Sequence, residues 1–497
     1  MSNIRRQSII SSFVIYIGYA VGLLNTYFFA RFFTPAEYGL TSIFIAIATM
    51  MMAFATLAMP SYIHKFYPYY KDHLPPNKID MMTWALLICS IGFLLVMIAG
   101  WVFKDLVIRK FGEHSPELLS YYYWIFPMGF GLTIYTVLEA YAWNVGKPIL
   151  TNFLKEALWR LFTTVLIVLF VTKIIGDFDL FIKLFAFGFP FIAVTLFFYL
   201  VKTKKIHLQF SISKVSRRFF KKIVSLCLFV YSSMLITTLS QVFDSIVIAA
   251  ILDDGMAKAG IFNLAQILNS VILAPQRAVI AASIPHLSRA WKEKNQPLLQ
   301  RIYQRSSLNM LIFATGIFIL IALNYTDAIR IFRLRDEYLL GFNAFIVLGL
   351  TRIVDMGTGV NAQIIGTSTY WRFELISGAV LIILMLPLTI ILTRQYDILG
   401  PAIASLISIT IYNIIRIIFL WKKFKLFPFT IQSLYTLLIG GIGFIVCYYT
   451  FNGMHNFGGL VLRSIVFMGL YAGAVIYFRL SPDILPVLNT IRKRLRL

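Results

Sequence analysis

The chain has 497 residues, of which 59% are hydrophobic and only 13% charged, and its mean hydropathy is +0.80. Soluble domains carry about 25% charged residues, so this composition excludes a soluble globular protein and indicates a membrane protein. A formal net charge of +24 would suggest nucleic-acid binding in a soluble protein, but in a membrane protein basic residues report topology first. No nucleic-acid partner is therefore predicted.

The apolar runs predict about 14 membrane-spanning helices, because a helix needs about 20 residues to cross the bilayer. The first run follows Arg5 and Arg6 and lacks a small-residue cleavage site, so we interpret it as a retained span, not a signal peptide. The fold class is all-α, a polytopic membrane protein. The predicted spans are residues 9–30, 39–62, 81–103, 121–143, 150–172, 180–201, 223–251, 260–284, 306–326, 338–363, 371–393, 400–420, 431–450 and 459–480.

The basic residues are distributed unevenly between the two sides of the membrane. With the N-terminus inside, about 29 of the 45 Lys and Arg residues fall in inner segments and about 11 in outer ones. This predicts a protein of the cytoplasmic (inner) membrane with both termini cytoplasmic. The largest inner block, residues 202–222, is predicted to form an amphipathic helix on an anionic leaflet, with a solvated basic loop as the alternative. The tail RKRLRL, residues 492–497, is predicted to anchor at the membrane surface.

No connection between spans exceeds about 21 residues, which leaves no aqueous domain for chemistry and weighs against an enzyme. Asp177 and Asp179 form a D-x-D pattern known from sugar-nucleotide metal sites, but they lie in a short outer loop where no nucleotide sugar is expected. Cys89, Cys227 and Cys447 lie inside apolar runs, which favours packing roles over disulfides or a metal site. No cofactor or metal is predicted.

The two halves of the chain share a sequence pattern about 222 residues apart, which indicates an internal repeat. In each half a glycine opens a span, and that span ends in Ser-x-x-His: Gly39, Ser61 and His64, then Gly260, Ser283 and His286. A repeat of six helices preserves orientation and is a recurring design of secondary transporters, with the substrate site between two lobes. The predicted organisation is an N-terminal lobe (1–201), a basic linker (202–222), a C-terminal lobe (223–420), and two extra helices with the basic tail (421–497).

The seventh span carries a carboxylate, Asp244, inside an otherwise apolar run. Such a group costs several kcal/mol at membrane depth unless it is paired, hydrated or protonated. Helical spacing places it on one face with Ser233, Thr237, Ser240 and Gln241. The next span carries amides at similar depth, Gln266 among Asn263 and Asn269. A proton or sodium ion is the predicted neutralising partner, and a hydrogen bond joining two helices is the alternative.

Deeply placed charged residues in other spans are further candidates. Arg277 has no carboxylate one turn away in the sequence, whereas Arg352 has Asp355 one turn away, so pairing on its own helix is the alternative for Arg352. Arginine suits an anionic, phosphate-bearing substrate because its donors form a planar fork. In the first half, Glu156 and Arg160 form an i, i+4 pair and Glu139 lies at comparable depth. These three are interpreted as a salt-bridge network, with cavity lining as the alternative.

At this point the sequence resembles a known family. NTYFFARFFTPAEYGLTSIFIAI, residues 25–47, and SQVFDSIVIAAIL followed by AGIFNLAQ, within residues 240–266, resemble polysaccharide flippases of the Wzx type in the multidrug/oligosaccharidyl-lipid/polysaccharide exporter superfamily. The resemblance covers essentially the whole chain and implies a V-shaped pair of six-helix lobes. It implies flipping of an undecaprenyl-pyrophosphate-linked oligosaccharide by ion-driven alternating access.

The resemblance further implies that Arg31 and Arg277 line a cationic cavity, and Arg352 and Asn25 are added as candidate substrate contacts. Membrane lipids, the coupling ion and, by the same resemblance, a polysaccharide polymerase with its chain-length machinery are the expected partners. Two extra C-terminal helices also occur in lipid II flippases, so the substrate stays open. A multidrug exporter of the MATE branch is the nearest alternative, and a membrane glycosyltransferase or polymerase is a more distant one. The predicted motion rocks residues 1–201 against 223–420.

Overall fold

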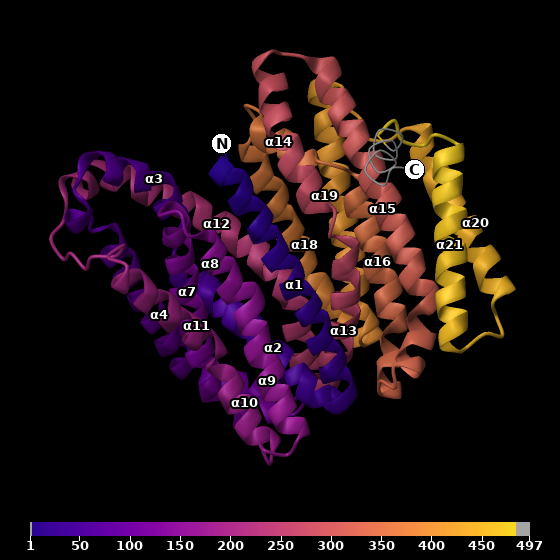
Figure 1. Cartoon of the computed structure of the whole chain (residues 1–497), viewed down its shortest axis with the longest axis horizontal. Coiled ribbons are helices and arrows are strands. Elements are labelled where there is room, and N and C mark those ends of the chain that lie inside the picture. Colours follow the sequence, from indigo (N-terminus) through magenta and orange to yellow (C-terminus); the bar gives the residue numbers. More distant parts are fainter. Residues whose placement is uncertain (1, 484–497) are drawn as a thin grey trace. The chain divides into compact units, whose positions relative to one another are not determined.

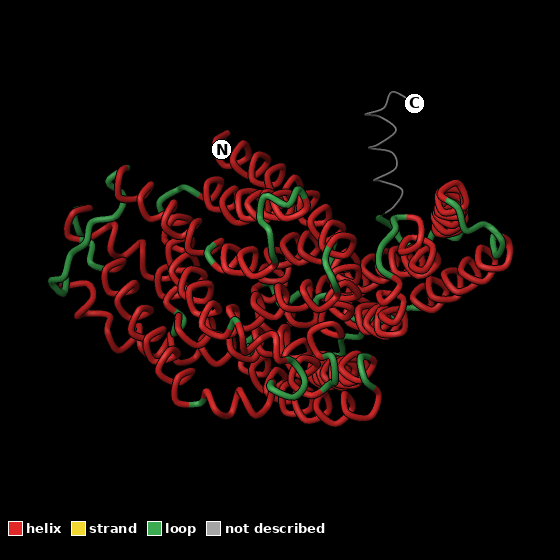
Figure 2. The backbone as a smooth tube through the Cα atoms, turned by 90° about the horizontal axis from the view of Figure 1, so that it is seen from below, coloured by secondary structure: helices red, strands yellow, loops and turns green. Residues whose placement is uncertain are grey.

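The computed structural model describes residues 2–483, except for the side chains of residues 2–13 and 278. Figure 2 shows helices joined by short loops, with no strand in the described part of the chain. The all-α class is confirmed. In the described residues, 11 helical segments are long and apolar enough to cross a membrane. The other three predicted spans correspond to α1, to the continuous α8–α9 segment, and to α13 with α14. The predicted basic tail, 492–497, lies outside the described residues.

Contacts divide the chain into two units, residues 1–260 and 261–497. This division places the whole of α12 in the first unit, so the predicted lobe boundary at 202–222 stays a prediction. The helices of the first unit, labelled in Figure 1, are α1 (Ser2–Phe32), α2 (Pro35–Thr56), α3 (Met59–His73), η1 (Pro76–Lys78), α4 (Met81–Val102), α5 (Lys104–Phe111), α6 (Pro116–Ser120), η2 (Tyr122–Trp124), α7 (Ile125–Asn144), α8 (Pro148–Asn152), η3 (Phe153–Leu158), α9 (Trp159–Val171), α10 (Phe178–Ala186), α11 (Gly188–Lys202) and α12 (Lys214–Ile251).

The second unit begins within α13 and ends with the two extra helices. α20 and α21 pack against each other and against α15. The elements are α13 (Gly255–Ile272), α14 (Gln276–Lys292), α15 (Gln296–Ile331), η4 (Asp336–Gly341), α16 (Phe342–Gly357), α17 (Asn361–Thr367), α18 (Arg372–Tyr396), α19 (Leu399–Phe424), α20 (Ile431–Thr450) and α21 (Phe457–Tyr477).

The Thr-Pro-x-Glu stretch before α2 is a helix-start signal. The backbone N–H of Glu37 donates to the Thr34 hydroxyl (3.2 Å), and the Thr34 backbone N–H donates to the Glu37 carboxylate (2.7 Å). This capping box, with Pro35 in the first turn, satisfies two otherwise unpaired backbone donors. One turn further, Gly39 lies directly against Gly260 and the carbonyl of Met256. The two glycines aligned by the sequence repeat therefore touch each other, and a Cβ on Gly39 would overlap the Met256 carbonyl oxygen.

Two predicted spans are each broken by a short turn. The predicted span 39–62 ends as α2 at Thr56, because Leu57 and Ala58 adopt left-handed backbone conformations (φ 46° and 58°), and α3 starts again at Met59. The predicted span 260–284 is likewise interrupted by a turn at 273–275 that ends in a proline. The helix after each break carries one Ser-x-x-His, and the internal repeat stays a prediction.

The basic segment 202–222 is not one amphipathic helix, so that prediction was wrong over its first half. Residues 205–213 form no helix, and α12 begins only at Lys214 because the Ser213 hydroxyl accepts the backbone N–H of Ser216 (3.1 Å) and caps it. The non-helical part is tied to α4, where the Gln209 backbone N–H donates to the Thr83 hydroxyl (2.8 Å). The basic residues from Lys214 onward therefore belong to the N-terminal end of α12, the helix that forms the seventh span.

Candidate functional site

The first unit brings together charged side chains from α7 and from the helix that follows it. Lys155 Nζ lies 3.2 Å from the Glu139 carboxylate, which is nearly buried while the lysine side chain is 41% exposed. Sequence reasoning selected Glu139 but missed Lys155. Ionisable residues within membrane helices usually face the bundle interior or a water-filled pathway, because lipid cannot solvate them.

The helix carrying Lys155 is locally wound as a π-helix, η3, between α8 and α9. Short π-segments are rare and are frequently found at functional sites. η3 also carries Glu156, whose carboxylate is 2.8 Å from Arg160 Nη2; this predicted i, i+4 ion pair is confirmed. α1 approaches the pair closely, because Gly18 packs on the Glu156 backbone and Gly22 on the Arg160 side chain. A larger residue at Gly18 would push α1 away from the Glu156 backbone, and one at Gly22 would displace the Arg160 side chain.

The two predicted contacts on α1 have different surroundings. Asn25 is buried, donates from Nδ2 to the Arg160 carbonyl (2.8 Å) and accepts from the Thr164 hydroxyl (2.6 Å). Both ends of its amide are therefore used to join α1 to α9, which favours a structural role. Arg31 is half-buried at the end of α1 and donates from Nη1 to the Tyr27 hydroxyl (2.9 Å).

Asp244 lies in the C-terminal part of α12 and is 4% exposed. Of the predicted polar stripe, Thr237 and Gln241 are exposed and Ser233 and Ser240 are partly buried. The stripe thus runs from the surface of α12 into the packed part of the first unit at Asp244. Gln266, on α13, belongs to the second unit, and its pairing with Asp244 stays a prediction.

In the second unit the dominant charged residue is Arg416 on α19, which sequence reasoning missed. Its side chain is 2% exposed and lies 2.6 Å from the Glu374 carboxylate of α18. It also donates to the Ser377 hydroxyl (3.1 Å) and to the Asn361 side-chain oxygen (3.3 Å), and its guanidinium lies 3.9 Å from the centre of the Tyr412 ring. With three donor contacts and one ring face, this arginine is held in a single geometry.

The same network continues to α16 through amides. Asn413 accepts from Asn361 Nδ2 (2.8 Å) and donates to the Asp355 carboxylate (3.2 Å). No ion pair joins Arg352 to Asp355 in the described part of the chain, so the alternative of pairing on one helix is not supported. Arg352 Nε is buried and makes no hydrogen bond with any described residue.

Arg277 is not on the same helix as Gln266, which corrects the predicted eighth span. The turn at 273–275 places Arg277 in the first turn of α14, where its side chain is exposed. Proline at the start of a helix is favourable, so Pro275 was the available signal for this break. The predicted unbroken span 260–284 was therefore wrong, and the depth of Arg277 in the membrane stays a prediction.

Another buried ion pair that the sequence reasoning missed lies near the C-terminal helices. Arg463 of α21 contacts the Asp327 carboxylate of α15 and donates from Nε to Asn324 (3.0 Å), while His455 Nδ1 lies 2.9 Å from the other Asp327 oxygen. These contacts connect the extra helices to the second unit. Arg416 and Arg463 both stand alone in apolar runs, and that isolation was the signal.

Comparisons with known proteins were made for sequence and structure. No curated protein sequence matches the chain. The structure is similar to a lipid II flippase, MurJ, in an inward closed conformation, with a TM-score of 0.69, 17% identity, and coverage of 95% of this chain and 99% of that one. It is also similar to an inward-facing multidrug resistance MATE family transporter of the MOP superfamily, with a TM-score of 0.62, 14% identity, and coverage of 88% and 98%.

A MOP superfamily transporter from Pyrococcus furiosus matches with a TM-score of 0.53, 14% identity, and coverage of 88% of this chain and 96% of that one. These likenesses concern the fold. The sequence evidence is a family model, described as polysaccharide biosynthesis protein, that matches residues 4–291. Because this match covers more than half of the sequence, and because the helices form a multi-pass membrane fold shared with flippases and transporters, the chain belongs to the polysaccharide biosynthesis protein family.

Proposed function

We propose that the protein moves an undecaprenyl-pyrophosphate-linked oligosaccharide, such as a repeat unit of O-antigen, capsule or exopolysaccharide, from the inner to the outer leaflet of the cytoplasmic membrane. Transport occurs by ion-coupled alternating access, with residues 1–201 rocking against 223–420 and both termini cytoplasmic. The observation that carries this proposal is the partly exposed ion pair Lys155–Glu139 beside the π-helix, in a chain of a polysaccharide biosynthesis family.

The substrate's pyrophosphate is an anion, so it competes with Glu139 for Lys155. A lysine ammonium is a mobile point charge that can exchange one anion for another without a fixed geometry. Arg31, Arg277 and Arg352 are the other proposed cationic contacts, and Asn25 is the least favoured because α9 already occupies its amide. In this scheme substrate binding releases a carboxylate, which then takes up a proton.

Asp244 is the proposed coupling residue, with Gln241 and Gln266 as its predicted neighbours. A nearly buried carboxylate changes its energy strongly on binding a proton or sodium ion, because the charged form is poorly solvated. Partners that receive the flipped product, including a polymerase and chain-length proteins, belong to the same proposal.

Two alternatives compete with this function. A MATE-type cation antiporter is supported by the fold likeness, and a lipid II flippase by the likeness to MurJ. A glycosyltransferase or polymerase is the weakest alternative, because the family and the structural neighbours are associated with transport.

The test is translocation of a fluorescent undecaprenyl-pyrophosphate oligosaccharide in proteoliposomes, with and without a proton or sodium gradient. Wild type should move the lipid faster with one of the gradients, and Asp244→Asn should lose the gradient dependence. Asp253→Asn is the matched control, because this aspartate is exposed and pairs with His114 outside the predicted spans. Extrusion of organic cations with no lipid movement would overturn the proposal in favour of an antiporter.

A further inference from the structure

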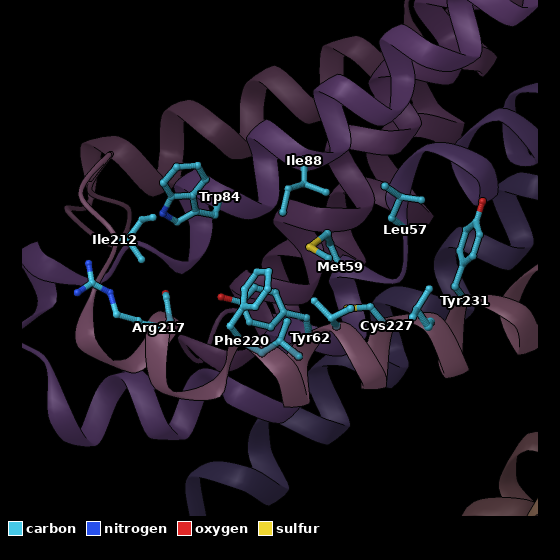
Figure 3. Close-up of a pocket in the computed structure, with 14 residues that line it drawn as sticks. Leu57, Met59, Tyr62, Trp84, Ile88, Ile212, Arg217, Phe220, Cys227 and Tyr231 are labelled. Carbon is cyan, nitrogen blue, oxygen red and sulfur yellow. The ribbon is translucent and has the colours of Figure 1, made fainter.

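An elongated cavity of about 600 Å³ lies in the first unit between the N-terminal half of α12, the start of α4 and the junction of α2 with α3. This volume is within the range of small-molecule sites. Most of its wall is apolar, including Leu57, Ile88, Val224 and Leu228. Figure 3 shows the lining side chains following α12 from Arg217 at one end to Tyr231 at the other.

Polar groups gather at one end of this cavity. Arg217 lies there, and Figure 3 shows the indole nitrogen of Trp84 on the side nearest Ile212 and Arg217. Trp84 Nε1 is buried and makes no hydrogen bond with any described residue. A buried donor without a partner is costly, so such a group calls for an acceptor that the protein does not itself supply.

The polar end is held rigidly by a network behind it. Asp80 is fully buried and accepts from the Ser213 backbone N–H (2.9 Å) and the Ser216 hydroxyl (2.8 Å). Ser216 in turn lies 2.6 Å from the Tyr70 hydroxyl, which is 2.8 Å from that of Tyr62. These bonds fix α12 to α3 and α4, so the cavity is already formed in the free protein.

The dimensions and charge match a phospholipid. Arg217 and Tyr231 are 14 residues apart on one helix, or about 21 Å, which is slightly more than one leaflet of hydrocarbon at about 15 Å. The predicted topology places the Arg217 end at the inner surface. The first turns of α12 add further basic side chains, Lys214, Arg218, Lys221 and Lys222, all of them exposed, and such clusters attract anionic lipid.

We propose that this cavity binds one acyl chain of an anionic phospholipid of the inner leaflet. The chain lies along α12 toward Tyr231, and the phosphate accepts hydrogen bonds from Arg217 and from the Trp84 indole. None of the residues that line the cavity is among the proposed substrate or ion contacts, and the proposal does not depend on what the protein transports.

Native mass spectrometry of the purified full-length protein tests the site directly, by titrating phosphatidylglycerol and, separately, phosphatidylcholine. Wild type should bind the first lipid preferentially. Arg217→Gln should weaken that binding about fivefold or more, as expected for one lost basic contact with an anionic lipid. Arg218→Gln is the matched control, because Arg218 is an exposed neighbour that does not line the cavity; it removes the same surface charge without the proposed phosphate contact, so its loss should be smaller than that of Arg217→Gln. If both variants lose the same lipid affinity, the effect comes from surface charge alone and the proposal of a phosphate site at Arg217 fails.

A second variant fills the apolar part. Leu228 lines the cavity but is 66% exposed, so Leu228→Trp should occupy the space without disturbing the core and should displace phosphatidylglycerol. Undisturbed lipid binding in this variant would place the acyl chain elsewhere. Undecaprenyl phosphate is the third ligand to titrate: if it displaces phosphatidylglycerol and is lost in both cavity variants, the occupant is the substrate's own tail and the proposal fails.

Discussion

The first unit leaves its intramembrane cations partly accessible, with the Lys155 side chain 41% and that of Arg160 23% exposed, whereas Arg416 in the second unit is 2% exposed. The carboxylates of the two units are spaced like the internal repeat. Asp355 lies 216 residues after Glu139 and Glu374 lies 218 residues after Glu156, close to the 221 residues between Gly39 and Gly260. The first unit thus carries partly exposed ion pairs, whereas Arg416 belongs to a buried network. Under the proposed function, Lys155 is available to exchange partners and Arg416 supports the structure of the second unit.

The largest expected effect is on stability in the second unit. Arg416→Met removes three donor contacts and leaves Glu374 without its cation, which should cost about 3 kcal/mol of unfolding free energy. This is near the low end for buried pairs because the Glu374 side chain is 37% exposed. The readout is the thermal unfolding midpoint in detergent. Replacing both Arg416 and Glu374 by Met should recover part of the lost stability. If Arg416→Met is as stable as wild type, Arg416 does not support the second unit, and the proposed difference between the units fails.

Backbone packing, not ion pairing, is the expected source of rigidity in the first unit. Gly39→Ala forces a methyl group against the Met256 carbonyl and Gly260, and overpacking of this kind costs about 1–3 kcal/mol. Gly441→Ala in α20 is the control, because no described residue lies within 4 Å of the added Cβ; alanine there should be neutral or slightly stabilising. If both variants unfold at the wild-type temperature, the Gly39 contact is not a stabilising one.

A smaller loss is expected from the ion pair on the π-helix. Glu156→Gln should cost about 1 kcal/mol, more than an exposed pair and much less than Arg416→Met. Asp179→Asn is matched in spacing and order, since Asp179 pairs with Lys183 four residues later (2.6 Å) but at an exposed site; its cost should be near zero. The measurement is the denaturant midpoint of unfolding for both variants. If both midpoints shift by the same amount from wild type, the Glu156–Arg160 pair contributes no more than a surface pair.

Local sequence signals accounted for the membrane fold and for part of the site. Long apolar runs predicted the helical class, and the i, i+4 spacing of Glu156 and Arg160 predicted their ion pair, because both depend on neighbours along the chain. The confirmed family followed from residues such as Thr34-Pro35-Ala36-Glu37, which are now explained as a helix cap.

Contacts between helices were beyond such reasoning. Lys155 contacts Glu139 from another helix. The π-helix η3 that carries Lys155 has no distinctive local sequence pattern. Arg416 was overlooked because its partners Glu374 and Asn361 lie on α18 and α17, far from it in sequence. The eighth span was predicted as unbroken because the short turn Leu273-Ala274-Pro275 barely lowers the hydropathy of the run, although it ends the helix.

The smallest stability change, and the sharpest separation of the two units, is expected at Lys155. Its side chain is 41% exposed, and the nearly buried Glu139 left without its cation takes up a proton instead of staying charged, so Lys155→Gln should change the unfolding free energy by only about 0.5 kcal/mol. If Lys155 exchanges Glu139 for the substrate's pyrophosphate, the same variant should slow lipid translocation in proteoliposomes about tenfold or more, and Lys155→Arg should restore part of the rate because it keeps the charge. Glu139→Gln should slow transport as well, since no carboxylate is then released. Wild-type translocation by Lys155→Gln would make the first unit's ion pair as structural as that of Arg416, and the division of roles between the units would be lost.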